Sequence, residues 1–362
     1  MREDRVRNCA VLPEKQRQGI RCPAKYNAMV KKRILFLLVM ALCLGLVSCG
    51  SFRGEIRFGT AGIGGTYYAY GAALAQMMEE TNDQYNFSVK TTAGSAANLR
   101  LLREEFLDLA IVQSDTLSDA VGGTGVFVTA GPAVGYAAVA GLYTEACQIV
   151  VPANSGIERV QDLAGKRVSV GERESGVLQN ARDILLSHGI SLEMLEPSYL
   201  SFADSASAME RGELDAFFCT AGAPTSAVSE LAAQTEIRLL SIAPDTLDSL
   251  TRLYSGYTPC TIPAGTYPGQ DRDVETLGVK AVLVASTDLK EDTVAYLTEF
   301  LFANSEKLRY ATSVSTDLSL DYAVTDIPLS FHPGAARYYV SQGMDVEIYS
   351  GASGQRLTAG QD

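Results

Sequence analysis

A glycine-rich turn near residue 60 is the first feature of this sequence that could bind a ligand. Its letters, GTAGIGGTYYAYGAAL, follow a strand-like segment at 55–58 and lead into a helical pattern at 66–80. Such a turn exposes the free N–H groups at the start of a helix, which attract anions. A dinucleotide fingerprint needs a third glycine where Tyr67 stands, and a P-loop needs a lysine after Gly64 or Gly65. The turn therefore predicts an anion site, with a dinucleotide site disfavoured and a P-loop excluded.

Four further turns place small and hydroxyl-bearing residues where a predicted strand gives way to a helix. They lie at 92–100, 112–120, 171–181 and 219–228. Each one alone is typical of ordinary turn chemistry. Ligands of open α/β sheets bind outside the carboxyl ends of the strands. Five such turns, three from one half of the chain and two from the other, therefore favour one shared cleft.

Side chains that commonly carry out catalysis are scarce. The two histidines, His188 before a helix-ending glycine and His332 before a proline, stand at positions that predict structural roles. The sequence has no G-x-S-x-G, H-E-x-x-H or C-x-x-C motif, which leaves hydrolase, zinc-protease and thioredoxin-type sites without support. We therefore expect a binding protein and not an enzyme, with no metal and no cofactor.

The elements that must position these turns alternate along the chain. Strand patterns occupy 55–60, 87–92, 107–113, 137–143, 147–152, 166–171, 214–220, 237–242, 261–267 and 278–286. Helix patterns occupy 66–80, 95–104, 176–188, 205–211, 225–234, 292–304 and 333–342, and 119–135 is a glycine-rich connection. The alternation predicts an α/β fold with a mainly parallel sheet.

The N-terminus has the pattern of an export signal. A basic start at 29–33 precedes an uncharged stretch at 34–49 that is short for a membrane span of roughly 20 residues. Its end, LVSC before Gly50, resembles a bacterial lipobox, in which Cys49 would carry the lipid. We expect an upstream extension at 1–28, a lipoprotein signal peptide at 29–48 and a tether at 49–54. A membrane anchor helix is the less favoured alternative.

The charge of the chain depends on that N-terminal region. The net charge is −12, but residues 1–33 hold ten Lys and Arg and three Asp and Glu, which leaves 20 basic and 39 acidic residues. This acidic balance argues against nucleic-acid binding and is compatible with a solvated extracytoplasmic protein. The cysteines left after processing, Cys147, Cys219 and Cys260, fit either one disulfide or three buried thiols.

Six segments occur in a familiar order between residues 55 and 345. They are FGTAGIGGTYYAYGAALAQMM, TTAGSAANLRLL with FLDLAIVQSD, LAGKRVSVGERESG, GELDAFFCTAGAPTSAVSEL, IPAGTYPGQDRDVETLGVKAVLVAS and SFHPGAARYYVSQGM. Together they resemble the TAXI family of TRAP-transporter solute receptors. The resemblance implies a two-lobed, type II periplasmic-binding-protein fold with hinge strands between the lobes. The first lobe would comprise 55–145 and 275–362, and the second 146–274.

The resemblance also implies a function. The chain would capture a small organic anion, glutamate-like or dicarboxylate, or an amino-acid solute, and deliver it to TRAP membrane subunits. It would act outside the cytoplasm, tied to the cell membrane by its N-terminal lipid. The residues that match the family's binding turns are Thr60, Gly64, Gly65, Thr66, Tyr67, Ser95, Asn98, Gln113, Ser114, Ser175, Gly176, Ala221, Gly222, Pro224, Thr225 and Tyr257.

One turn departs from the family pattern. The GERESG segment carries Glu172, Arg173 and Glu174 where small residues are more usual. Arg173 could pair with a carboxylate of the solute, or it could be an exposed arginine offset by its two neighbours. Two other functions stay open on the same two-lobed fold: a sensor or interaction lipoprotein, and an enzyme acting on a small metabolite.

Overall fold

The computed structural model describes residues 54–82, 84–129, 131, 135–312, 314 and 318–351, and the backbone of 355–357. The expected upstream extension, signal peptide and lipid site at Cys49 lie outside the described residues, as does most of the tether. Within the described ranges, no helix has both the length and the apolar character needed to cross a membrane.

The first lobe is built around three parallel strands. β1 (Gly54–Gly59) pairs with β2 (Tyr85–Lys90) on one side and β3 (Leu109–Gln113) on the other. Every residue of β3 is buried, as its continuous apolar run predicts for a central strand. The strands lead into α3 (Thr66–Thr81), α4 (Ser95–Arg103) and α5 (Ser114–Gly122), followed by the 3-10 turn η3 (Gly125–Phe127).

The second lobe repeats this plan. β5 (Arg167–Ser169) pairs in parallel with β6 (Glu196–Ser198) and β7 (Ala216–Ala221). The helices are α6 (Gly176–Ser187), α7 (Phe202–Glu210), α8 (Ser226–Ala232) and α9 (Pro244–Leu253). The 3-10 turns η4 (Val160–Leu163) and η5 (Leu192–Met194) and the strands β8 (Ile237–Leu239) and β9 (Tyr257–Ile262) complete the lobe.

Each lobe fixes its first strand with the same Arg–Asp clamp. The Arg57 guanidinium donates to Asp108, with 2.6 Å between Nη2 and Oδ1, and the Arg57 backbone N–H donates to the same carboxylate. Arg167 makes both contacts with Asp215, with 2.7 Å between Nη2 and Oδ1. The shared clamp makes β1 equivalent to β5 and β3 equivalent to β7, so α3 and α6 begin at corresponding sheet edges.

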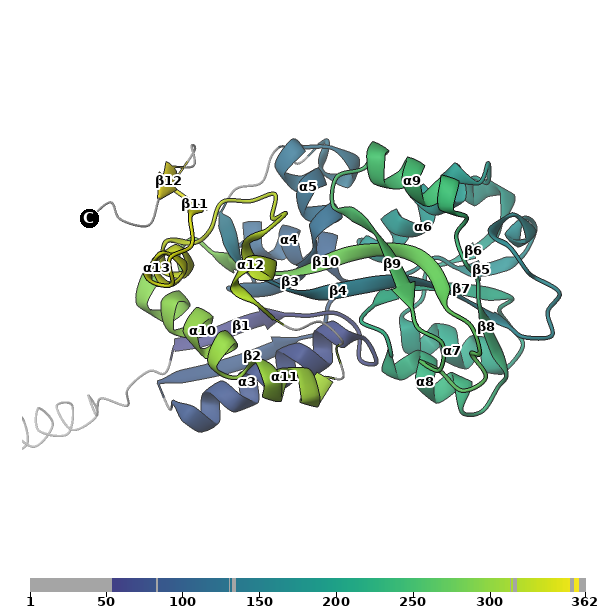
Figure 1. The fold of residues 1–362 in the computed structure, drawn as a ribbon, viewed down its shortest axis with the longest axis horizontal. Helices are drawn as coiled ribbons and strands as arrows, with labels where there is room; N and C mark the ends of the chain where they lie inside the picture. Colours follow the sequence, from purple (N-terminus) through teal and green to yellow (C-terminus); the bar gives the residue numbers. More distant parts are fainter. Residues whose placement is uncertain are drawn as a thin grey trace, which may run out of the picture. The chain divides into compact units, whose positions relative to one another are not determined.

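Two long strands run through both lobes. β4 (Tyr136–Pro152) and β10 (Val274–Ser286) pair antiparallel over most of their length and are nearly all buried (Figure 1). The sequence predicted two strands at 137–143 and 147–152, but β4 is one strand that does not stop at the polar residues between them. The sheet order is β2-β1-β3-β10-β4-β7-β5-β6, with β8 on β4 and β9 on β10.

The predicted α/β fold is confirmed, but the sheet is mixed and not mainly parallel. β4 and β10 are antiparallel to each other, and each is antiparallel to the strand on its other side, β7 and β3 respectively. The reason is that β4 runs from the first lobe to the second and β10 runs back from the second lobe to the first. A chain that crosses twice in opposite directions must place antiparallel strands in the middle of the sheet.

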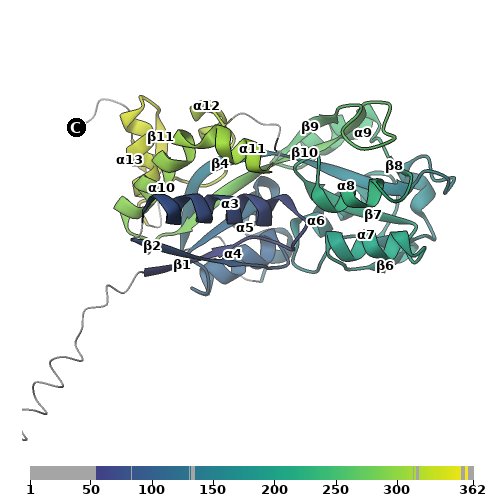
Figure 2. The same cartoon turned by 90° about the horizontal axis from the view of Figure 1, so that it is seen from below.

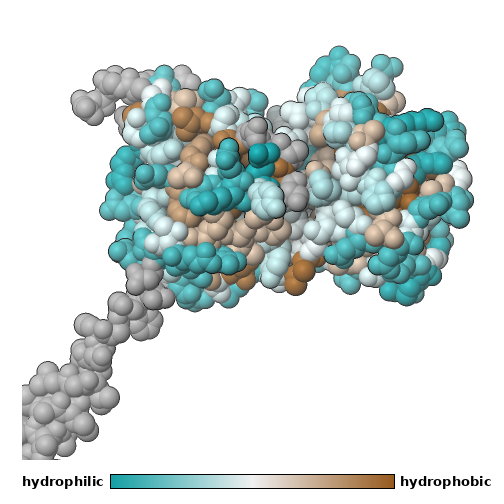
Figure 3. All heavy atoms as spheres, turned by 60° about the horizontal axis from the view of Figure 1, so that its bottom comes forward, coloured by the Kyte–Doolittle hydropathy of each residue, from teal (hydrophilic) through white to brown (hydrophobic). Residues whose placement is uncertain are grey.

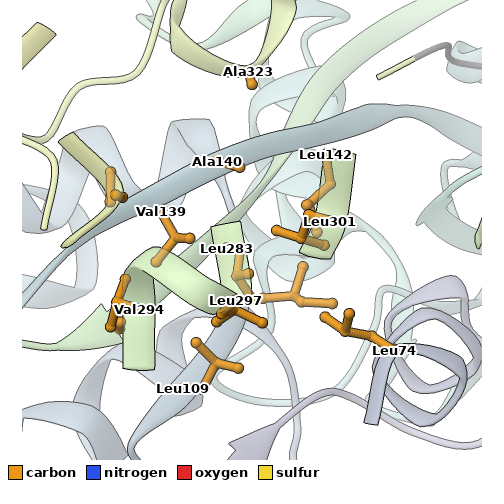
Figure 4. Close-up of a cluster of buried hydrophobic side chains, with 14 of the residues drawn as sticks. Leu74, Leu109, Val139, Ala140, Leu142, Leu283, Val294, Leu297, Leu301 and Ala323 are labelled. Carbon is orange, nitrogen blue, oxygen red and sulfur yellow. The ribbon is translucent and has the colours of Figure 1, made fainter. Parts of the chain in front are cut away.

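The last helices return to the first lobe (Figure 2). α10 (Glu291–Ala303), α11 (Ser305–Thr312), α12 (Leu320–Val324) and α13 (Pro333–Ser341) precede β11 (Val346–Ile348), which pairs with β12 (Gln355–Leu357). Their apolar side chains join a core with α3 and the strands; Figure 4 shows Leu297 and Leu301 of α10 beside Leu74 of α3. Separate core clusters fill the second lobe. One second-lobe cluster also contains Leu277 and Val279 of β10, and the lobe boundaries stay a prediction from the sequence.

Candidate functional site

A cavity lies between the two lobes and is lined by both. The outline of the described residues is indented between the lobes in the space-filling view (Figure 3). The cavity has a volume of about 40 Å³. Its lining residues are Ala61, Gly62, Gly65, Thr66, Tyr67, Ala93, Gly94, Ser95, Gln113, Glu145, Glu172, Ser175, Gly176, Val177, Leu200, Ser201, Phe202, Thr220 and Ala221.

Three helices begin at this cavity. The residues that precede α3, α4 and α6 are Gly65, Gly94 and Ser175, and all three line the cavity wall. The Ser175 hydroxyl caps α6, because it accepts a hydrogen bond from the Leu178 N–H at 3.1 Å. Gly65 and Gly94 have no side chain, so the first N–H groups of α3 and α4 have no such cap. Two helix starts without a side-chain cap form a favourable environment for an anion at this cavity, although the Ala97 N–H of α4 is already bonded to the Glu174 carbonyl.

The charged side chains of the cavity wall are acidic. Glu145 is 1% exposed and comes from β4, and Glu172 comes from the GERESG turn. Among the described residues, no Lys, Arg or His lines the cavity. An anion held here would therefore be bound by backbone N–H groups and hydroxyl groups and not by a basic side chain.

Glu145 accepts a hydrogen bond from helix α3 of the first lobe. The Tyr67 hydroxyl donates to Glu145 Oε2 at 2.9 Å. Burial raises the pKa of the Glu145 carboxyl to about 8, although the hydrogen bonds from Tyr67 and Gln113 favour the ionised form. This shift favours the protonated carboxyl as long as no cation lies beside it.

A buried polar network lies behind the cavity and joins the lobes. Asn180 of α6 donates to Asp115 of α5 at 2.6 Å and to the Tyr257 hydroxyl at 3.1 Å. Tyr257 in turn donates to Asp183 at 2.6 Å, and Gln113 Nε2 donates to Asn180 Oδ1 at 3.2 Å. Burial raises the pKa of Asp115 to about 7.

Further direct contacts hold the two lobes together. The Ala97 N–H donates to the Glu174 carbonyl at 3.0 Å, and the Ala227 N–H donates to the Gly64 carbonyl at 3.3 Å. Arg100 forms an ion pair with Glu174 at 2.9 Å between Nη2 and Oε2. These contacts all run from one lobe to the other, so the structure has the lobes in direct contact.

The family of this chain follows from a match with a family model over residues 58–343, described as the NMT1-like family. The chain belongs to the NMT1-like family. The members of this family are substrate-binding proteins of the periplasmic type. The match does not reach the finer level of TAXI receptors.

Several solved structures are similar at low sequence identity. One is the periplasmic aliphatic sulphonate binding protein SsuA from Escherichia coli, with 16% identity, TM-score 0.41 and coverage of 79% of this chain and 78% of that chain. Another is the alkanesulfonate-binding protein SsuA from Xanthomonas axonopodis pv. citri bound to MOPS, with 17% identity, TM-score 0.44 and coverage of 84% of this chain and 87% of that chain. A third is a putative L-cystine ABC transporter from Listeria monocytogenes, with 15% identity, TM-score 0.46 and coverage of 73% of this chain and 98% of that chain. At these values the similarity says nothing about the solute of this chain.

Half of the site residues predicted from the sequence come together in the cavity wall. They are Gly65, Thr66, Tyr67, Ser95, Gln113, Ser175, Gly176 and Ala221. They come from both lobes and from all five predicted turns, as a shared cleft requires.

The other predicted residues lie outside the wall and hold the turns or the lobes in place. Asn98 donates to the carbonyls of Thr60 and Ile111 at 2.7 and 2.9 Å. Gly64 and Gly222 accept hydrogen bonds across the lobes, and Ser114 donates to the Gly256 carbonyl. Thr225 follows Pro224 and bonds with Gln148 and Tyr267, while Tyr257 belongs to the buried network. These residues stay proposals as contacts of a solute.

Sequence reasoning missed Glu145 and Phe202. Glu145 stands in an otherwise apolar strand, and a lone carboxylate in such a run is a signal of a functional site. Phe202 begins α7 and lines the cavity next to Ser201. Its position gives no signal in the sequence, since an aromatic residue at a helix start is ordinarily part of a core.

The three charged residues of the GERESG turn have different surroundings in the structure. The Arg173 guanidinium lies 3.9 Å from the ring centroid of Tyr199 in the same lobe and does not line the cavity. Glu172 lines the cavity, and burial raises the pKa of its carboxyl. Glu174 pairs with Arg100 of the other lobe. The turn thus contributes to closure, and Arg173 is not placed to meet a solute carboxylate.

The remaining reactive side chains have structural roles. His188 ends α6 and bonds to the Ile184 carbonyl, and His332 precedes α13 and accepts from the Gly334 N–H, as the sequence predicts. Cys147, Cys219 and Cys260 are free thiols, so they form no disulfide; Cys147 and Cys219 are buried, whereas Cys260 is only partly buried. Among the described residues, no group of His, Cys, Asp and Glu side chains is arranged to hold a metal ion.

Proposed function

We propose that this chain is an extracytoplasmic receptor that closes its two lobes around a small organic anion, glutamate-like or dicarboxylate, or an amino-acid solute. The observation that supports this most is the cavity between the lobes, where two uncapped helix starts from the first lobe face residues of the second. A carboxylate there would accept backbone hydrogen bonds without a basic side chain. Membership of a family of substrate-binding proteins supports capture over catalysis.

Binding would proceed by hinge closure. β4 and β10 are the two long connections between the lobes, and the direct contacts between the lobes include backbone hydrogen bonds and the Arg100–Glu174 ion pair. Such contacts can separate at low cost in water, since each group can bond to solvent instead. A solute that touches both lobes would then favour the closed state.

The partner for delivery is part of the proposal. The six TAXI-like segments favour TRAP membrane subunits, and the lipid expected on Cys49 would keep the receptor beside them at the membrane. An ABC transporter is the alternative within a family of this breadth. Uptake reconstituted with each type of membrane protein would distinguish them, because TRAP transport would require an ion gradient and ABC transport would require ATP.

A thermal-unfolding screen tests capture itself. A panel of small carboxylates and amino acids should contain at least one compound that raises the melting temperature in proportion to the logarithm of its concentration. A panel that leaves the melting temperature unchanged at millimolar concentrations would contradict the proposed function.

A further inference from the structure

The cavity has an imbalance of charge that solute capture does not yet explain. Its wall carries the Glu145 and Glu172 carboxyl groups, and none of the described lining residues is basic. Glu145 is almost completely buried, yet the groups that donate hydrogen bonds to it, the Tyr67 hydroxyl and the Gln113 amide, are both neutral. A buried carboxylate without a cation is costly, so such a position is rarely kept without a partner.

A second buried acceptor lies in the same wall. Gln113 is 2% exposed, and its Oε1 has no hydrogen-bond partner among the described residues. The neighbouring network fixes the orientation of its amide: Asn180 Nδ2 donates to Asp115, so Asn180 Oδ1 must be the atom that accepts from Gln113 Nε2. Gln113 Oε1 is therefore the atom left without a donor, and it lies beside Gly176 at the cavity wall.

Both acceptors lack a positively charged hydrogen-bond donor, and one kind of group could serve both of them. An ammonium carries three N–H donors and one positive charge, which matches a carboxylate beside an unpartnered amide oxygen. The geometry points to a solute that carries a protonated amine, bound by Glu145 and Gln113, as well as the carboxylate bound at the starts of α3 and α4. This inference rests on the proposed function, and it narrows the solute class from organic anions in general to amino carboxylates.

The titratable groups around Glu145 agree with a cation from the solute. They are Tyr67 from α3, Asp115 from α5, Tyr143 and Cys147 on its own strand, and Cys219 from β7. All of them are neutral or anionic, so none supplies the missing positive charge. Burial raises the pKa of Glu145 to about 8, which favours the protonated carboxyl while no cation lies beside it, and an ammonium would favour loss of that proton.

One other role for Glu145 would use the same atoms. A neutral carboxyl could donate a hydrogen bond to a solute carboxylate. The variant Glu145→Gln separates the two roles, because glutamine keeps a neutral donor and the acceptor for Tyr67 but cannot balance the charge of an ammonium. A neutral-donor role would survive this substitution, and an ammonium-binding role would not.

The test measures affinities for pairs of compounds that differ only in the amine. Titration calorimetry would compare glutamate with glutarate, aspartate with succinate and alanine with propionate, on the wild-type chain and on Glu145→Gln. We expect the wild type to bind the better amine-bearing compounds at least about 30-fold more tightly than their amine-free partners. In Glu145→Gln the ratio should fall close to one, with the affinity for the amine-free compound little changed.

The proton balance gives a second readout. Titrations of the wild type at pH 7 in two buffers of different ionisation enthalpy should show release of about one proton per amine-bearing solute bound. Glu145→Gln should release none. Proton uptake by the wild type, or equal release by the variant, would overturn the assignment.

Two further variants make the result specific. Glu172→Gln removes the second cavity carboxyl and should change the amine preference by less than about threefold, because that side chain is only partly buried. Glu230→Gln on the exposed face of α8 controls for loss of one negative charge and should change nothing. Loss of amine preference in Glu172→Gln with its retention in Glu145→Gln would overturn the role of Glu145.

The outcomes also separate this inference from the proposed function. If both members of every pair bind equally well, solute capture stands and the amine inference is wrong. If neither member of any pair binds, the capture of a small carboxylate is itself wrong, and the inference is wrong with it.

Discussion

At the scale of single residues, Gly176 is a position where the lobes approach each other closely. A Cβ built there would lie 1.5 Å from Gln113 Oε1 and 3.0 Å from Thr116 Oγ1, both of the other lobe. Gly176→Ala should therefore oppose closure without disturbing the open lobes. We expect solute affinity to fall at least about tenfold while the melting temperature without solute changes little.

The control for this substitution is Gly54→Ala. No atom lies within 4 Å of a Cβ at Gly54, and its backbone conformation suits any residue. It should leave affinity unchanged. Affinity in Gly176→Ala equal to that of the wild type would mean that the lobes do not approach in this way around the solute.

The size of the side chain that is tolerated at Gly65 tests whether the first glycine-rich turn lines the binding site. A Cβ there would meet the Phe202 ring and the Gly62 carbonyl at 3.4 Å, which is close to ordinary contact, so Gly65→Ala should bind solute with only a small loss. Gly65→Leu would extend into the cavity and against Phe202, and should abolish binding with the fold intact. Calorimetry measures binding, and circular dichroism checks the fold. Full binding by Gly65→Leu would contradict the placement of the site.

At the scale of elements, the Arg–Asp clamps hold the first strand of each lobe. Burial alone would raise the pKa of Asp108, but the hydrogen bonds from Arg57 outweigh it and hold the pKa below its usual range. A lowered folded-state pKa means that the ionised carboxylate stabilises the fold above its unfolded-state pKa of about 3.9, and that this stabilisation is lost as the pH falls through the folded-state value.

Asp108→Asn should therefore lower the free energy of unfolding by about 1 kcal/mol at pH 7. The difference from the wild type should shrink near pH 3, where Asp108 of the wild type is becoming protonated. Urea unfolding at both pH values measures this. A difference that grows as the pH falls would contradict the assignment of the clamp.

The elements could be predicted from the sequence where the periodicity was strong, as in α3, α6 and the buried β3. The prediction failed at β4 because Thr144 and Glu145 look like a polar break in an apolar run. They are part of one continuous strand, and Glu145 is buried at the cavity. The prediction of a mainly parallel sheet failed because direction depends on how the chain crosses between lobes, which local patterns do not contain.

The candidate site was also predicted only in part, because tertiary packing decides which side chains face the cavity. The five turns were recognisable from their small and hydroxyl-bearing residues. The sequence could not show which side chain of a turn faces the cavity, so Ser95 lines it while Asn98, one helical turn away, instead ties α4 to β3 and to Thr60. Glu145 and Phe202 reach the cavity only through tertiary packing.

At the scale of the whole molecule, the Arg100–Glu174 ion pair bridges the lobes outside the cavity. Both side chains are about half exposed, so the pair is weak and sensitive to salt. Arg100→Gln should release solute roughly two- to fivefold faster at low ionic strength, and this difference should vanish in about 1 M salt. Stopped-flow release kinetics measures both values.

Arg337→Gln is the control, because Arg337 forms a more exposed ion pair with Asp292 that lies inside the first lobe. Its release rate should equal that of the wild type at every salt concentration. A similar acceleration in both variants would show that the effect comes from the charge of the chain and not from a contact between the lobes.

The most direct test of the account is a crystal structure with the solute bound between the lobes. We expect the solute carboxylate within hydrogen-bond distance of the first N–H groups of α3 and α4, with Gly65, Gly94 and Gly176 at the cavity wall. A solute bound outside this cavity, or with its carboxylate held by a basic side chain such as Arg173, would contradict the account.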